Sequence, residues 1–457
     1  MKVSKASGIV VQILHELKAK QSRPFPESSI NTTPELPSWI DAGEGQSLII
    51  NGAISGLIVD LADHLYASKP ELKNSISKKD WSSIVKRVIG PMLGKVDLDV
   101  SFETSAIEVL AAIKVDLNRS DWNFGKRTFL FGCSLVSHHD IPPFTVGPVT
   151  IRRRHMWLDH ALQERRISRL TYSRLAASWS GTKIRPRKPS LESGNERAII
   201  RAVGEAPFVC SIETEGLFGD FAKEKALLAA RLTLLGVALL WASPRKALQE
   251  INLAYDGPPH LQAYTFYQER PELLSGGRWT KSLHGLSLFG DAWEPIIAQR
   301  NNWWATLAEA IEFLLGNPVQ AQRPKLMTSF AHALIWFHEA CREPMPMIAL
   351  TKYISCLDAL ACGSQAPGII ALVSARMEVE PEAPIRADGP SFKSAINQLY
   401  SRGRSRLLHG SSDRLGHDWE DQRELAETLA RYCLILCFEW AAQHPECDDP
   451  KQMKVPA

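Results

Sequence analysis

Arg404 and His409 stand five residues apart at the end of an apolar-periodic segment, and Gly410 follows directly. Imidazole can move protons near neutral pH, and guanidinium is a permanent cation that can bind a phosphate through two hydrogen bonds. Together these groups could cleave a phosphodiester by acid–base catalysis and charge stabilisation. A pair at this spacing arises by chance about once in a chain of this composition, so its surroundings must decide.

The same residues have a structural explanation. Cationic side chains near a helix C-terminus interact favourably with the helix dipole, and glycine commonly follows a helix directly. In an ideal helix five residues turn through about 500°, so Arg404 and His409 point roughly 140° apart around the axis. One helix does not bring both side chains to one point unless its last turn unwinds, which Gly410 permits.

Apolar spacing predicts a bundle of helices around this pair. The segments after residue 299 carry apolar residues three and four positions apart, with Pro346 suited to a first turn and Gly316 and Gly363 to helix ends. Tyr353, Leu357, Leu360 and Ile348 are expected in the core. The inward stripe expected for the last helix is Leu425, Leu429, Tyr432, Leu436 and Trp440. The predicted bundle segments are 301–316, 325–343, 346–363, 390–409 and 419–443.

The first 298 residues mix helical periodicity with strand-like runs. Residues 127–136, 144–151, 208–214, 263–269 and 285–289 read as strands. The predicted fold class is therefore α+β, an N-terminal mixed α/β region followed by an all-α bundle. Between 181 and 197, Pro, Ser, Gly and charged residues replace any apolar period and indicate a boundary. The predicted parts are 1–190, 191–298 and 299–457.

Composition is that of a folded protein: the chain has 457 residues, 45% apolar and 23% charged. The longest apolar run, 226–242, contains Arg231 and is interpreted as a buried helix, so no membrane association is expected. The eight cysteines follow no zinc or disulfide pattern, which favours a reducing, cytoplasmic compartment. We expect neither a metal nor another cofactor.

Residues 152–188 carry the strongest charge asymmetry of the chain, with eleven Lys and Arg against Asp159 and Glu164. Such density is typical of a nucleic-acid groove, and Trp157, Tyr172 and Trp179 are available for base stacking. A solvated basic helix and loop explains the charges equally well. The candidate RNA-binding residues are Arg152, Arg153, Arg154, Arg185, Arg187 and Lys188 here, and Arg402 and Arg406 beside the Arg404–His409 pair.

The run LYSRGRSRLLHG, 399–410, preceded by ALTKYISCLDALACG, 349–363, resembles the HEPN domain family, particularly its ApeA-like branch from bacterial antiphage systems. The likeness is confined to the helical part after residue 300. Asp358 stands where glutamate is commoner in the family, and Ser405 where Asn, Asp or His is often found.

The resemblance implies a metal-independent endoribonuclease that acts as an abortive-infection effector, toxic to its own cell when active. His409 would transfer protons, Arg404 would clamp the phosphate, and Asp358 and Ser405 would complete the catalytic set. The family dimerises so that two such helices share one cleft, which predicts a homodimer. The region before residue 299 is expected to restrain the nuclease or to sense a phage-derived activator.

Two other interpretations stay open. A catalytically inactive HEPN-like scaffold would use Arg404 only to bind nucleotide or nucleic-acid phosphates, or would serve in dimerisation. A DNA-binding regulator would work through the basic segment 152–188, although no helix-turn-helix pattern is present there.

Overall fold

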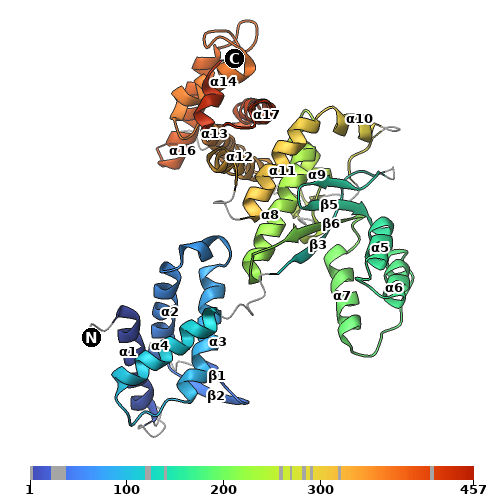
Figure 1. The fold of residues 1–457 in the computed structure, drawn as a ribbon. Helices are drawn as coiled ribbons and strands as arrows, with labels where there is room; N and C mark the ends of the chain where they lie inside the picture. Colours follow the sequence, from blue (N-terminus) through green and yellow to red (C-terminus); the bar gives the residue numbers. More distant parts are fainter. Residues whose placement is uncertain are drawn as a thin grey trace. The chain divides into compact units, whose positions relative to one another are not determined.

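A computed structural model of the chain describes residues 4–21, 38–118, 125–137, 141–256, 261–267, 270–279, 285–288, 292–316, 321–411 and 416–456 (Figure 1). Contacts divide the chain into two compact units. Unit 1 comprises Met1–Lys126 and Glu215–Glu224, and unit 2 comprises Arg127–Thr214 and Lys225–Ala457.

Unit 1 is a set of helices with one β-hairpin. Its helices bury aliphatic residues three and four positions apart, among them Ile13, Ile58, Val85 and Ile113. Asn51 and Ser77 cap two of the helices, each accepting a backbone N–H of the first turn. The elements are α1 (Lys5–Gln21), β1 (Ser38–Gly43), β2 (Gln46–Ile50), α2 (Gly52–Ala67), the 3₁₀ helix η1 (Pro70–Asn74), α3 (Lys78–Gly94) and α4 (Phe102–Asn118).

A four-stranded antiparallel sheet forms one part of unit 2. Its strands are β3 (Arg127–Cys133), β4 (Phe144–Val146), β5 (Val149–Arg153) and β6 (Phe208–Thr214), in the order β3-β6-β5-β4. The central β6 is buried on both faces over most of its length. The helices α5 (Arg154–Gln163), α6 (Arg169–Trp179) and α7 (Leu191–Val203) lie beside this sheet (Figure 1). Val209 packs on one face of it with Trp157, Leu175 and Val203 of these helices.

The long helix α8 (Gly219–Ala238) begins in unit 1 and continues into unit 2. Gly236 allows the first bundle helix to pack directly against it, because a Cβ there would lie 2.4 Å from a Leu307 methyl carbon. The apolar run 226–242 is largely buried, as predicted. The elements that follow α8 are α9 (Pro244–Glu250), η2 (Ala254–Asp256), β7 (Leu261–Tyr267), β8 (Arg270–Trp279) and α10 (Trp293–Ala298).

The remaining helices of unit 2 form the predicted bundle. The third helix, α13, packs against α12, α14 and α17, and edge-to-face or tilted aromatic pairs such as Phe330–Phe438 and Phe337–Tyr353 fill the space between them. The elements are α11 (Asn301–Leu315), α12 (Pro324–Arg342), α13 (Pro346–Leu360), α14 (Gln365–Met377), α15 (Phe392–Gln398), the π-helix η4 (Leu399–Ser405), α16 (Arg406–Leu408), α17 (Glu420–Gln443) and η5 (Pro450–Lys454).

The α+β class is therefore confirmed, with a sheet in the first half of the chain and helices in the second. Two expected core residues are exposed instead: Ile348 is 36% exposed and Tyr432 is 44% exposed. The buried face of α17 contains small residues such as Ala426, Ala430 and Ala441, which large-residue periodicity does not reveal. Among the described residues, no single helix has the length and apolarity to cross a membrane, although α13 and α14, bent by 72°, pass that test as a pair.

The two units cut the chain at different places from the boundaries predicted at 190/191 and 298/299. Strands β3 and β6 pair along their whole length, from Arg127 opposite Thr214 to Cys133 opposite Phe208. The chain before and after residue 190 therefore meets in one sheet. The strand predicted at 285–289 is reduced to a single bridge between Val136 and Leu286, and residue 289 lies outside the described residues.

Two glycine substitutions test the packing of α7 on the sheet. A Cβ at Gly132 in β3 would lie 2.1 Å from the Val203 carbonyl oxygen, so Gly132→Ala should destabilise unit 2 by about 2 kcal/mol through overpacking. A Cβ at Gly194, within α7, meets nothing within 4 Å. Gly194→Ala should stabilise the protein by about 0.5–1 kcal/mol, because glycine lowers helix stability. Denaturant unfolding measures both changes, and equal effects would contradict the described packing.

Candidate active site

Three side chains surround the Arg404 guanidinium. Its Nε donates to Ser355 Oγ at 3.3 Å, and Nη1 donates to the Tyr400 hydroxyl at 2.9 Å. Its Nη2 lies 3.5 Å from Asp358 Oδ2. Arg404 and Asp358, predicted together from the sequence, thus lie side by side and are both largely buried, with side chains 24% and 13% exposed.

A π-helical turn carries Arg404. The segment Leu399–Ser405 interrupts the predicted α-helix between α15 and α16. Gly403 in this turn is buried against Leu350 of α13, where a Cβ would lie 2.9 Å from a Leu350 methyl carbon. The close approach brings Arg404 to the Ser355 and Asp358 face of α13. Single π turns within α-helices occur frequently at functional sites.

Asp358 also fixes the start of the next helix. Its Oδ1 accepts the backbone N–H of Gln365, the first residue of α14, at 3.0 Å. The carboxylate therefore contacts the N-terminus of α14, where a negative charge is favourable, while its other oxygen faces Arg404. On the same corner, Lys454 Nζ donates to the Ala361 carbonyl at 3.2 Å and to Ser364 Oγ at 3.0 Å.

The continuous segment formed by α15, the π turn and α16 is called the motif helix. His409 is its C-cap residue, directly after Leu408, and is exposed. The backbone N–H of Ser411 donates to the Arg406 carbonyl at 2.9 Å and that of Gly410 to the Leu407 carbonyl at 3.3 Å, the pattern of a Schellman cap. Gly410 has a φ of +65°, which glycine adopts without strain. The predicted helix end at Gly410 is confirmed.

Arg404 and His409 are not joined within the described part of one chain by any hydrogen bond or ion pair. Ser405, between them, is half-buried, and its carbonyl accepts the backbone N–H of His409 at 3.0 Å. Arg402 and Arg406 are both exposed beside them. The end of this helix therefore presents guanidinium and imidazole groups, a surface that attracts phosphate.

The basic segment 152–188 is partly neutralised by carboxylates from outside it. Glu196 of α7, almost fully buried, accepts hydrogen bonds from Arg174 Nε at 2.9 Å and from Arg187 Nη1 at 3.1 Å. Arg187 also donates to Glu192 at 2.8 Å, which raises the pKa of the guanidinium. Arg185 and Lys188 remain exposed.

The other predicted residues of this segment contact aromatic rings or are partly buried. The guanidinium carbon of Arg153 lies 4.3 Å from the centre of the Phe208 ring, and that of Arg154 lies 5.6 Å from the Trp179 ring. Burial lowers the pKa of Arg152 and Arg154. Trp157 is 6% exposed and packs edge-to-face on Trp179, so it belongs to the core and offers no face for base stacking.

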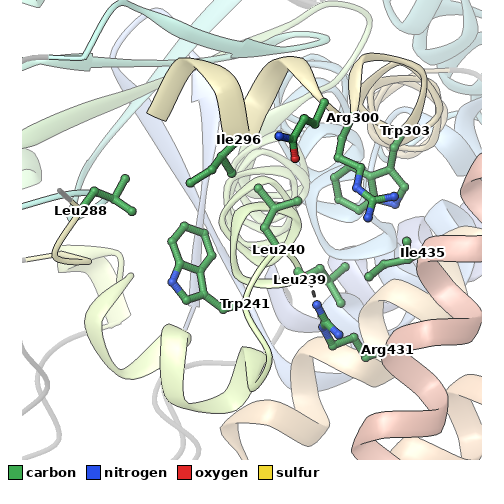
Figure 2. A pocket seen from close by; sticks show the side chains of 10 residues that line it. Leu239, Leu240, Trp241, Leu288, Ile296, Arg300, Trp303, Arg431 and Ile435 are labelled. Carbon is green, nitrogen blue, oxygen red and sulfur yellow. Dashed lines mark hydrogen bonds between the residues drawn. The ribbon is translucent and has the colours of Figure 1, made fainter. Parts of the chain in front are cut away.

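A separate hollow of about 290 Å³ opens between α10, α11, α17 and the residues that directly follow α8 (Figure 2). Arg431 Nε donates to the Leu239 carbonyl at its edge, at 3.0 Å. None of Arg404, His409, Asp358 and Ser405 lines this hollow. Its lining residues are Leu239, Leu240, Trp241, Leu288, Ile296, Gln299, Arg300, Trp303, Arg431 and Ile435.

Two site residues were not predicted from the sequence, Ser355 and Tyr400. The spacing of these residues in the sequence could have indicated both. Ser355 precedes Asp358 by three residues and Tyr400 precedes Arg404 by four, and such spacings place two side chains on one helix face. The described residues contain no cluster of three or more His, Cys, Asp or Glu that could hold a metal ion.

The chain matches no family model, and comparisons with curated proteins and with solved structures find no match.

The Glu192 carboxylate predicts a pH effect on stability. Ser168, Thr171 and Arg187 donate hydrogen bonds to it and lower its pKa from 4.5 to about 2. Because the folded state depresses this pKa, the stabilisation is complete above pH 4.5 and is lost as the pH falls to about 2. Glu192→Gln should therefore show a shallower loss of unfolding free energy across that window than the wild type does. Glu446→Gln, at an exposed position, is the control and should follow the wild type.

Proposed function

We propose that this chain is a metal-independent endoribonuclease of the HEPN type, acting in antiphage defence. The observation that carries the proposal is the Arg404 guanidinium held by Ser355, Tyr400 and Asp358, on a helix that ends in the exposed His409. The Arg404 guanidinium is already fixed in one orientation when a phosphate binds to it. The His409 imidazole is exposed and can contact a substrate from solvent.

The chemistry follows from these two groups. The 2′-hydroxyl of RNA attacks the adjacent phosphorus, and the bond from phosphorus to the 5′-oxygen breaks, leaving a 2′,3′-cyclic phosphate. His409 transfers a proton to or from one of these oxygens. Arg404 stabilises the negative charge that gathers on the phosphate in the transition state. A guanidinium has five N–H donors, and Ser355 and Tyr400 engage two of them, so others can face a phosphate.

A homodimer supports this chemistry better than one chain does. The Arg404 side chain lies against α13, whereas His409 follows the helix end in solvent. We place the twofold axis beside the motif helix, so that Arg404 of one protomer faces His409 of the other. An isologous interface repeats this contact and so forms two equivalent sites. The exposed Arg402, Arg406, Arg185 and Lys188 are the proposed RNA contacts.

The proposal also covers the cellular location of the nuclease and its regulation. All eight cysteines are free, which supports a reducing, cytoplasmic location. We assign restraint of the nuclease, or sensing of a phage-derived activator, to the region before residue 299, since uncontrolled RNA cleavage would kill the cell.

A catalytically inactive scaffold is the second candidate. One observation favours it: Tyr400, Ser355 and Asp358 already engage all three nitrogens of Arg404, so the guanidinium has a structural role as well. In that case Arg404 and His409 would contribute to phosphate binding or dimerisation without cleavage.

Labelled RNA separates the two candidates. The protein is incubated with single-stranded RNA in EDTA, with an extract of phage-infected cells supplying the activator. We expect products that end in a 2′,3′-cyclic phosphate. His409→Ala should lower the cleavage rate by about 10²–10⁴-fold and Arg404→Ala by about 10²–10³-fold, through loss of proton transfer and of charge stabilisation.

Matched substitutions at exposed positions, Arg386→Ala and His332→Ala, should cleave as the wild type does. Circular dichroism checks that all variants fold. Binding of RNA without cleavage would support the scaffold, and unaltered cleavage by either site variant would refute the catalytic assignment.

Mixing two inactive variants tests the shared site. Chains carrying Arg404→Ala and chains carrying His409→Ala are unfolded together and refolded. If Arg404 and His409 act across the dimer, mixed dimers contain one intact site and recover part of the cleavage activity. No recovery, with mixed dimers demonstrated by mass spectrometry, would place both residues of a site in one chain.

A further inference from the structure

The three groups around Arg404 hold it in different ways. Ser355 and Tyr400 are neutral hydroxyls that accept hydrogen bonds from Nε and Nη1. Asp358 Oδ2 lies 3.5 Å from Nη2, which is long for a hydrogen bond. The two hydroxyls therefore set the direction of the guanidinium, and the carboxylate contributes mainly its charge.

Asp358 is engaged elsewhere as well. Its Oδ1 accepts the Gln365 backbone N–H at 3.0 Å, a shorter contact than that between Oδ2 and Arg404. One oxygen of the carboxylate therefore keeps its partner at the start of α14 when the other oxygen turns away from Arg404. Losing the longer contact would leave the fold of this corner in place.

We propose that Tyr400 is a positioning residue for Arg404, and that Asp358 stands where an RNA phosphate binds. We rest this inference on the function proposed for the same site. A phosphate oxygen that replaces Asp358 at Nη2 meets a guanidinium already oriented by Ser355 and Tyr400. The conformational entropy of ordering this long side chain is then lost before the substrate arrives, which favours binding and reaction.

The ring of Tyr400 adds a second contact. The guanidinium carbon of Arg404 lies 5.2 Å from the ring centre. The chain offers a matched comparison on α17, where the guanidinium carbon of Arg431 lies 5.2 Å from the ring of the exposed Tyr432. There the hydrogen bond of Arg431 goes to the Leu239 carbonyl. Tyr432→Phe is therefore the control for Tyr400→Phe.

The experiment measures binding and cleavage separately. Binding uses a fluorescent RNA oligomer with 2′-deoxy sugars at its cleavable positions, and cleavage uses the matching all-ribose RNA. Tyr400→Phe should weaken binding by about threefold through the lost hydrogen bond and lower kcat by about tenfold through misplacement of Arg404. Tyr432→Phe should change neither. Equal melting temperatures for both variants would exclude loss of folding.

Asp358→Asn tests the other half of the proposal. The amide oxygen can still accept the Gln365 N–H, but the negative charge that competes with a phosphate is gone. Binding of the uncleavable RNA should tighten by about threefold. Weaker or unchanged binding by Asp358→Asn would overturn the proposal that a phosphate takes the place of the Asp358 carboxylate beside Arg404. Unchanged binding by Tyr400→Phe would overturn the positioning role of Tyr400.

These outcomes remain distinct from those of the proposed function. If the wild type binds the RNA but does not cleave it, the nuclease proposal fails, and the two binding comparisons still decide this inference. If the wild type does not bind RNA at all, both proposals fail.

Discussion

The close approach of the motif helix to α13 is the constraint on which the site depends. Gly403 makes it sterically permissible, because any side chain there would press on Leu350. With the two backbones this close, Arg404 reaches Ser355 and Asp358 on the neighbouring helix. The π turn from Leu399 to Ser405 accompanies this approach. Van der Waals packing of one glycine thus determines where a charged group lies.

Most of the helical half could be predicted from the sequence because local signals agree there. Apolar spacing, Pro346 at a helix start and glycines at helix ends all indicate the same segments. The exposed Tyr432 shows where such patterns fail: α17 buries alanines and cysteines, whose size carries little periodic signal. The β1–β2 hairpin was missed because its strands are short and partly polar. Helix α3 was missed although Trp81, Ile84 and Val88 have helical spacing, because Gly90 and Pro91 within it are typical of a turn.

The candidate site was only partly accessible from the sequence. Arg404 and Asp358 stand 46 residues apart, and their proximity follows from bundle packing, which a family resemblance suggested and local periodicity cannot give. The π turn has no sequence signal of its own. In the basic segment, local composition misleads for a related reason: Glu192 and Glu196, which pair with its arginines, lie just beyond it in the chain. Pairing across a fold is not a local property.

The double engagement of Asp358 has a mechanical consequence. One oxygen accepts a hydrogen bond from the first turn of α14, and the other faces Arg404. A shift of α14 along its axis therefore moves the Asp358 carboxylate relative to the Arg404 guanidinium. Lys454 of η5 donates hydrogen bonds to Ala361 and Ser364, in the turn between α13 and α14. A force applied to η5, far along the chain from the motif helix, therefore needs to cross only a few polar contacts to reach Arg404.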